Sequence, residues 1–291
     1  MTYSELYRNG TKELSRAGIS EAALDARLLL EFLTGCDRQK LLMEPDAPVD
    51  HKDEASYGEL IAKRAEHIPL QQLTGSCSFM GIDFAVSDKV LIPRQDSECL
   101  VEEAMRYVTD GSDILDMCTG SGCLLLSLMH YKNNCRGVGV DISEDALNVA
   151  GRNLEMLRRD GGLNGGDAVL LQGDLYDALS EHSRKFDFII SNPPYIRSDV
   201  ISTLMPEVRD HEPHIALDGG DDGLDFYRRI ISGAPAHLAN YGMLFLEIGF
   251  DQAEDVSRIL ADAGFSDISV IKDYCGNDRV VSANYIARMK P

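Results

Sequence analysis

From residue 96 onward, apolar runs of strand length alternate with longer stretches in which apolar residues recur at helical spacing. These runs predict strands at 113–117, 137–141, 168–172, 186–191 and 242–248, and a closing pair at 268–272 and 280–284. Helices are predicted between the strands, for example at 145–158 and 223–234. Such alternation is typical of an α/β fold with a doubly wound, mainly parallel sheet, here of seven strands.

The N-terminal part of the chain has a different pattern. Apolar residues recur at helical spacing over 6–33, and another helix is predicted at 51–66. A β-like stretch follows at 78–93, in which the segment 85–88 is predicted to close a hairpin. The expected organisation is a small helical domain at 1–75, a β-hairpin linker at 76–94 and the α/β domain at 95–291. The helical domain could serve packing or substrate recognition, and substrate recognition is the role we expect.

The strand predicted at 186–191 ends in the residues Asn192, Pro193, Pro194 and Tyr195. Two consecutive prolines fix the backbone and remove two N–H donors, so the carbonyls of Asn192 and Pro193 are free to face a ligand. Asn192 adds a side-chain amide, and Tyr195 adds an aromatic face. Because open α/β sheets bind ligands at the carboxyl ends of their strands, this turn is suited to gripping a planar group that carries an NH2.

A small-residue loop follows the first predicted strand of the sheet. Gly120 and Gly122 would let the backbone approach a ligand closely, in front of the N-terminus of an apolar helix. Asp141 ends the next strand, where a carboxylate can accept hydrogen bonds from ribose hydroxyls. Leu125 stands where a nicotinamide-binding fingerprint has its third glycine. Asp116, just before the loop, would repel a pyrophosphate but suits a cationic amino acid.

Asp174 and Leu175 follow the third predicted strand, where they could flank an adenine ring. The residues predicted to bind the cofactor are Asp116, Cys118, Thr119, Gly120, Ser121, Gly122, Asp141, Asp174, Leu175 and Asn192. An acid, a glycine loop, a strand-end acid and an Asn-Pro-Pro-Tyr turn, in this order, indicate a methyltransferase that uses S-adenosylmethionine and acts on a planar nitrogen.

Net charge and cysteine content indicate which kinds of partner and which cellular location to expect. The chain has 291 residues and a formal net charge of −20, which argues against binding nucleic acid through phosphate contacts, although a local basic patch stays compatible with it. An acidic surface could also attract a basic partner segment. Seven cysteines without a Cys-x-x-Cys pair favour free thiols, and neither an apolar leader nor a membrane span is recognisable. We therefore expect a cytoplasmic protein that binds no membrane.

Two motifs resemble metal sites without matching them. In the segment His211-Glu212-Pro213-His214, the proline prevents the regular helical display of two histidine ligands. The acidic stretch at 217–224 does not follow the spacing of a calcium-binding loop. No metal is expected at either segment.

The complete set of motifs resembles the glutamine N5-methyltransferases that modify class 1 peptide chain release factors. The resemblance covers nearly the whole chain and rests on the segments 69–75 (PLQQLTG), 91–98 (LIPRQDSE), 192–195 and 212–220 (EPHIALDGG), with the glycine loop and Asp141. Two positions depart from the family pattern: Gln95 stands where Pro is usual, and Cys118 where Gly is frequent. Both bear on the geometry of a loop rather than on the reaction.

The resemblance implies a helical N-terminal domain, a β-hairpin and a methyltransferase domain, with S-adenosyl-L-methionine as cofactor. It implies a class 1 release factor as partner, modified at the glutamine of its Gly-Gly-Gln motif. The catalytic residues would be Asn192, Pro193 and Tyr195, and the substrate would be bound by these residues and Pro194. Our hypothesis is that the Asn192 side-chain oxygen and the Pro193 carbonyl accept the two amide N–H groups, while Tyr195 packs against the amide or walls the pocket.

Three alternatives stay open. The substrate could be a glutamine of a ribosomal protein, since the same turn would serve it. An adenine N6-methyltransferase would also use a planar NH2, but the charge of −20 and the lack of a basic recognition region weigh against it. A module that binds the cofactor without catalysis conflicts with the intact Asn192–Tyr195 turn.

Overall fold

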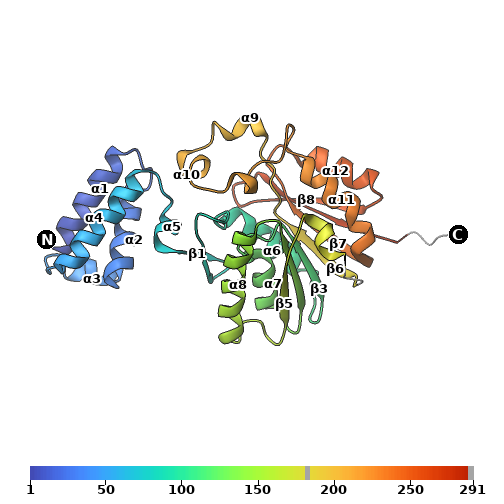
Figure 1. Cartoon of the computed structure of the whole chain (residues 1–291), viewed down its shortest axis with the longest axis horizontal. Helices are drawn as coiled ribbons and strands as arrows, with labels where there is room; N and C mark the ends of the chain where they lie inside the picture. The colour runs from blue at the N-terminus through green and yellow to red at the C-terminus, as the bar shows by residue number, and fades with distance from the viewer. Residues whose placement is uncertain (181–183, 288–291) are drawn as a thin grey trace. The chain divides into compact units, whose positions relative to one another are not determined.

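The structure is a computed structural model that describes residues 1–180 and 184–287. Its contacts divide the chain into two compact units (Figure 1). Unit 1 contains residues 1–76 together with the segment 205–211, and unit 2 contains the rest of the chain. The predicted domain bounds assign 205–211 to the α/β domain, whereas its contacts assign it to unit 1.

Unit 1 is a helical unit. Its helices are α1 (Tyr3–Arg16), α2 (Ala22–Thr34), α3 (Arg38–Met43), α4 (His51–Ala65) and α5 (Leu70–Thr74), with the short α10 (Pro206–Arg209). A capping box of Thr2 and Glu5 satisfies backbone donors at the start of α1. Gly10 lets α1 approach α4 closely, because a Cβ atom there would clash with the Tyr57 hydroxyl oxygen. The apolar faces of α1, α2 and α4 thus share one buried core.

The β-hairpin is present, but its turn differs from the predicted one. Its strands are β1 (Ser76–Phe79) and β2 (Ile82–Ala85), and they are joined by Met80 and Gly81. Both joining residues have positive φ angles, 51° and 72°, which is the backbone geometry of a two-residue type I′ turn. The prediction of a turn at 85–88 is therefore wrong, because glycine at 81 supplies the sharper reversal.

Unit 2 is built on a seven-stranded sheet in the order β5-β4-β3-β6-β7-β9-β8. The strands are β3 (Asp113–Met117), β4 (Arg136–Asp141), β5 (Asp167–Gln172), β6 (Phe186–Ser191), β7 (Leu238–Glu247), β8 (Ser266–Lys272) and β9 (Asp278–Asn284). The strands from β5 to β7 pair in parallel, and β9 joins β7 and β8 antiparallel. The predicted α/β fold with a doubly wound, mainly parallel sheet is confirmed.

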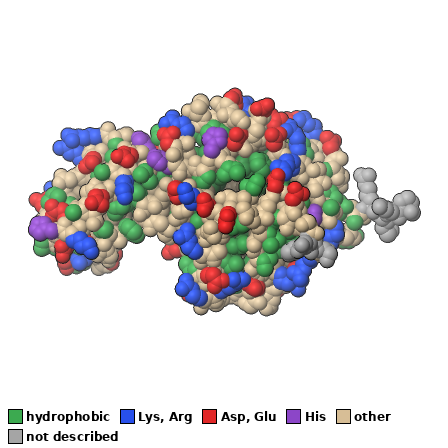
Figure 2. Space-filling view, in the orientation of Figure 1, with side chains coloured by type: hydrophobic (Ala, Val, Ile, Leu, Met, Phe, Trp, Pro, Cys, Tyr) green, Lys and Arg blue, Asp and Glu red, His purple; other side chains and the backbone are tan. Residues whose placement is uncertain are grey.

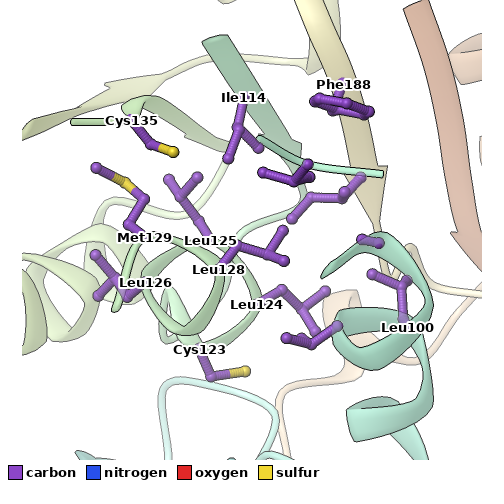
Figure 3. Packing of buried hydrophobic residues seen from close by; sticks show 14 of the residues in the cluster. Leu100, Ile114, Cys123, Leu124, Leu125, Leu126, Leu128, Met129, Cys135 and Phe188 are labelled. Carbon is purple, nitrogen blue, oxygen red and sulfur yellow. The ribbon is translucent and has the colours of Figure 1, made fainter. Parts of the chain in front are cut away.

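Helices cover both faces of this sheet because the residues of each strand alternate between two apolar clusters. The helices of unit 2 are α6 (Glu98–Met105), α7 (Cys123–Tyr131), α8 (Glu144–Arg159), α9 (Ser198–Ile201), α11 (Asp225–His237) and α12 (Ala253–Asp262), with short 3-10 turns at Gln95–Ser97, Leu175–Leu179 and His214–Ala216. Ile114 packs with α6, α7 and α8, whereas the next residue, Leu115, packs with α11 and α12. Figure 3 shows Leu125 and Leu128 of α7 against Ile114, with Phe188 of β6 nearby.

Acidic and basic side chains are interspersed on the face drawn in Figure 2, and hydrophobic groups gather near the middle of unit 2. None of the helices within residues 1–180 and 184–287 is both long and apolar enough to cross a membrane.

Candidate active site

A cavity of about 190 Å³ lies within unit 2 at the carboxyl edge of the parallel strands. It is lined by the segments that follow four strands: 118–121 after β3, 141–143 after β4, 173–175 after β5, and Asn192 with Pro194 after β6. The chain leaves β3 toward β4 and β5 on one side, and returns to β6 on the other side of β3. The cavity therefore lies at the switch point of the sheet, where ligands bind in this kind of fold.

The glycine loop between β3 and α7 has a left-handed backbone at three positions. The φ angles are 60° at Cys118, 55° at Gly120 and 81° at Gly122. Gly122 precedes the first turn of α7, whose backbone N–H groups face the same edge of the sheet. Cys118, Gly120 and the residues between them line the cavity, whereas Gly122 only starts the helix.

Asp141 connects this loop to β4. Its Oδ2 accepts a hydrogen bond from the Gly120 backbone N–H at 2.9 Å, and its Oδ1 accepts one from Ser143 at 2.9 Å. Burial raises the pKa of the Asp141 carboxyl, and these backbone donors oppose that effect. Asp141 lines the cavity, and a carboxylate oxygen can accept more than one hydrogen bond, so the side chain can still accept hydroxyl donors.

Asp116 lies behind the loop and does not line the cavity. It is fully buried, and its Oδ2 accepts a hydrogen bond from the Thr119 hydroxyl at 2.6 Å. Its Oδ1 has no hydrogen-bond partner among the described residues, and burial raises the pKa of this carboxyl to about 7. The observed role of Asp116 is to support the loop, and its contact with a cofactor stays a prediction.

The residues after β5 meet side chains from α11. Asp174 Oδ1 pairs with the Arg229 guanidinium at 2.8 Å, and that guanidinium lies over the Phe226 ring. Leu175 is 6% exposed and has a positive φ angle of 53°. Phe226 and Arg229 line the cavity together with Asp174 and Leu175. An apolar ring and a paired charge thus border the position predicted for adenine.

The Asn192–Tyr195 turn lies directly beside the glycine loop, since Ser191 of β6 pairs with Met117 of β3. The Ser191 hydroxyl donates to the Met117 carbonyl at 2.6 Å and ties the two strand ends together. Asn192 Nδ2 donates to the Ser97 Oγ at 3.3 Å. Within the described chain, neither Asn192 Oδ1 nor the Pro193 carbonyl accepts a hydrogen bond. Asn192 lines the cavity, so its free oxygen is available to a substrate there, whereas Pro193 is buried and does not line the cavity.

The segment 217–220 packs alongside this turn. The Ile196 backbone N–H donates to the Leu217 carbonyl at 2.9 Å, and the Gly219 N–H donates to the Ile196 carbonyl at 2.8 Å. A Cβ atom at Gly219 would lie 2.7 Å from the Tyr195 Cα, so only glycine allows this approach. The segment 217–220, part of the acidic stretch at 217–224, therefore holds the Asn192–Tyr195 turn in place.

The position of Tyr195 differs from the expected one. Its side chain does not line the cavity but packs against the core on the α11 face of the sheet. Its hydroxyl donates to Glu247 Oε1 at 3.3 Å, and burial raises the pKa of the Tyr195 hydroxyl. The expectation that Tyr195 walls the pocket is corrected, because a buried phenol needs the hydrogen-bond partner that Glu247 provides.

The segment 211–214 is used structurally. The Glu212 carboxylate is buried, pairs with Arg94 at 2.6 Å and accepts a hydrogen bond from the Ile92 N–H at 3.2 Å. Arg94 and Pro213 both line the cavity, so this ion pair braces its wall. Among the residues that the structure describes, no group of three or more His, Cys, Asp or Glu side chains could hold a metal ion.

Most of the predicted site residues meet at the cavity. Those that line it are Cys118, Thr119, Gly120, Ser121, Asp141, Asp174, Leu175, Asn192 and Pro194, and those that do not are Asp116, Gly122, Pro193 and Tyr195. No sequence motif singles out Ser97, Ile142, Phe226, Arg229 or Glu247 as a site residue. The strand-end rule that located Asp141 would also have located Glu247, which ends β7. The other four are placed by packing and carry no comparable signal.

A doubly wound sheet, a switch-point cavity, a glycine loop with a strand-end acid and an Asn-Pro-Pro-Tyr turn together define a methyltransferase. Residues 5–75 match the family described as PrmC N-terminal domain, and residues 95–207 match the Methyltransferase small domain. A release factor glutamine methyltransferase of Geobacter sulfurreducens is 40% identical over 268 residues, covering 92% of this chain and 91% of that protein. The chain belongs to the release factor glutamine methyltransferase family.

A second relative agrees with this assignment, and a solved structure shares the fold. The release factor glutamine methyltransferase of Clostridium acetobutylicum is 41% identical and covers 89% of this chain and 90% of that protein. The crystal structure of a methyltransferase from Pyrococcus furiosus shares the fold, with a TM-score of 0.50 at 19% identity over 72% of this chain and 92% of that one. The predicted family is confirmed.

Proposed function

We propose that this protein transfers a methyl group from S-adenosylmethionine to the side-chain amide nitrogen of the glutamine in the Gly-Gly-Gln motif of class 1 peptide chain release factors. The observation that carries the proposal is the Asn192–Tyr195 turn, in which Asn192 lines the cavity at the switch point and its side-chain oxygen has no hydrogen-bond partner among the described residues. The relatives named for this reaction extend over almost the whole chain.

The cavity suits the proposed cofactor. The left-handed backbone of the glycine loop brings main-chain atoms to the cavity wall, and Asp141 offers carboxylate oxygens to ribose hydroxyls. Leu175 and Phe226 supply apolar surface for a base. S-adenosylmethionine supplies an activated methyl group on a sulfonium, so the protein's task is placement.

The chemical obstacle lies in the substrate, because the lone pair of a carboxamide nitrogen is delocalised into its carbonyl. Acceptance of the two N–H groups by Asn192 Oδ1 and the Pro193 carbonyl would orient the nitrogen and favour a pyramidal geometry. Alignment of this kind can contribute roughly 7–11 kcal/mol in favourable cases. The methylated amide loses its extra proton readily, so no general base is required.

We further propose that the protein acts in the cytoplasm and binds neither membrane nor nucleic acid directly. The net charge of −20 supports this proposal, because a nucleic-acid enzyme needs a basic face. It also favours electrostatic attraction of a basic protein segment.

The test is methyl transfer from labelled S-adenosylmethionine to purified, unmethylated release factor. The control is the same release factor with the Gly-Gly-Gln glutamine changed to alanine. We expect label on the first substrate and none on the control. Label on a ribosomal protein or on nucleic acid, with none on release factor, would overturn the proposed substrate.

A further inference from the structure

Glu247 lies next to the substrate turn although it is distant from it in sequence. The parallel register pairs Ser191, the last residue of β6, with Leu246 of β7. Asn192, which follows β6, therefore lies beside Glu247, the last residue of β7. Glu247 is only 2% exposed. A buried carboxylate is costly unless it is paired, so its surroundings point to a function.

The hydroxyl of Ser97 is buried near both the Asn192 amide and the Glu247 carboxyl. Asn192 Nδ2 donates to Ser97 Oγ at 3.3 Å, and the nearby Ser97 hydroxyl lowers the pKa of the Glu247 carboxyl. Tyr195 donates to Glu247 Oε1 at 3.3 Å, whereas Oε2 has no hydrogen-bond partner among the described residues. Oε2 is therefore open to the Ser97 proton.

A hydroxyl has one proton to donate, so Ser97 cannot donate to both neighbours at once. When its proton points to a Glu247 carboxylate, its oxygen lone pair accepts from Asn192 Nδ2, and Asn192 Oδ1 is left for the substrate. A protonated Glu247 could instead donate to Ser97. The Ser97 proton would then turn to Asn192 and favour the flipped amide, which presents an NH2 group to the substrate and cannot accept its N–H.

We propose that the Glu247 carboxylate is a positioning residue, which acts through Ser97 to hold the Asn192 amide with its oxygen toward the substrate glutamine. This inference rests on the proposed function, because it concerns the same amide grip. It adds two residues, Ser97 and Glu247, which determine whether the Asn192 side-chain oxygen can accept a hydrogen bond from the substrate amide.

The charge of Glu247 depends on pH in a useful range. Burial raises the pKa of its carboxyl to about 7, while the nearby Ser97 hydroxyl and the positive charge of Arg279 oppose that rise. The other ionisable groups that face it are Asp96, Cys123, Tyr195 and Tyr227. Methyl transfer should therefore increase as pH rises through about 7.

The experiment is single-turnover methyl transfer to unmethylated release factor between about pH 6 and 9, with cofactor affinity measured by calorimetry. In Glu247→Gln we expect transfer to slow roughly tenfold or more, cofactor affinity to change by less than about threefold, and the rise near pH 7 to disappear. Ser97→Ala should show the same losses, and the double variant should be no slower than either single one, because both remove one relay.

Glu103→Gln is the matched control. Glu103 is another buried glutamate; it lies on α6, pairs with Arg106 just after that helix, and does not line the cavity. It should transfer at the wild-type rate. If Glu247→Gln does not fold, Ser97→Ala decides alone. Wild-type transfer and wild-type pH dependence in the Ser97 or Glu247 variant would overturn the inference. Absence of transfer by the wild-type protein would instead overturn the proposed function.

Discussion

At the residue scale, Cys118 combines two properties that rarely occur together. Its φ angle of 60° lies in the left-handed region, and its side chain lines the cavity. A residue with a Cβ atom pays about 1–2 kcal/mol for this conformation, which glycine adopts freely. Cysteine at position 118, where the resembled family often has glycine, therefore raises the energy of the backbone conformation. Burial also raises the pKa of the Cys118 thiol, so it stays protonated and unreactive.

We predict that Cys118→Gly raises the free energy of unfolding by ~0.5–1 kcal/mol, because relief of the left-handed strain exceeds the entropic cost of glycine. Cys118→Val should lower it by ~1–2 kcal/mol, since a β-branched side chain tolerates this backbone least. Urea unfolding of the wild-type, Cys118→Gly and Cys118→Val proteins measures their order of stability. A valine variant as stable as the glycine variant would show that the backbone is not strained.

Asn192→Asp tests the amide grip itself. The substitution removes the Nδ2 donor to Ser97 and places a negative charge close to Glu247. We expect kcat to fall roughly 100-fold or more, with only a modest loss of cofactor affinity. Asn240→Asp, at an exposed position in the first half of β7, is the matched control. Equal activity of the Asn192→Asp and wild-type enzymes would contradict the mechanism.

At the element scale, helix α7 packs closely on the sheet because β4 has a glycine, Gly137, at the position that α7 covers. A Cβ atom on Gly137 would lie 2.6 Å from the Met129 Sδ and 3.1 Å from Leu125 Cδ1. These two side chains belong to the cluster shown in Figure 3. Since the glycine loop leads directly into α7, this packing also fixes the cofactor side of the cavity.

Gly137→Val should therefore destabilise unit 2 by about 1–3 kcal/mol, because the core around α7 has no room for the side chain. Gly151→Ala in α8 is a matched glycine substitution with the opposite expectation. An added Cβ there would meet only Leu170 Cδ1 at 3.9 Å, and the helix should gain ~0.5–1 kcal/mol. Thermal unfolding of both variants and of the wild-type protein measures these changes in stability. A Gly151→Ala protein less stable than wild type would contradict this account of α8.

Local sequence was a good guide to the elements and a weaker guide to their ends. Strands β3 to β6 and helices α4 and α8 lie within one or two residues of the predicted ranges. The hairpin turn was misplaced by several residues, because the apolar pattern of 78–93 does not show where the chain reverses. The positive φ angles of Met80 and Gly81 decide that reversal.

At the scale of the whole molecule, unit 1 holds a segment from far along the chain. The buried Arg64 pairs with Asp25 at 2.7 Å and with Glu207 at 3.1 Å, and Glu207 also contacts His67 at 3.0 Å. Burial acts to raise the pKa of Glu207, but hydrogen bonds from His67 and Arg64 hold it below its ordinary value. Arg64 and Glu207 are 143 residues apart, so no local pattern could predict their contact.

Stability should fall as pH rises toward neutrality. Burial raises the carboxyl pKa of Asp116 and of Glu247 to about 7, from ordinary values of 3.8 and 4.5. Below about pH 4 both the folded and the unfolded chain keep these protons, and between about pH 4 and 7 only the folded chain does. The free energy of unfolding should therefore decrease over this window, by up to about 1.4 kcal/mol per pH unit for each carboxyl.

Urea unfolding of the unliganded protein at several pH values between about 4 and 8 measures this slope. Asp116→Asn, which keeps an acceptor for Thr119, should reduce the slope because one of the two buried protons is gone. Wild-type and Asp116→Asn proteins with the same pH dependence would show that Asp116 does not hold a proton in the folded state.

The sequence by itself determined the α/β class, the approximate elements and the edge of the sheet where the site lies. It could do so because strand periodicity and strand-end residues such as Asp141 and Asn192 are local features. The tertiary structure alone decided which side chains reach the cavity. It turned Tyr195 into the core, buried Asp116 behind its loop, and brought Ser97 and Glu247 to the Asn192 amide. These positions follow from strand order and packing between distant segments, which no local pattern encodes.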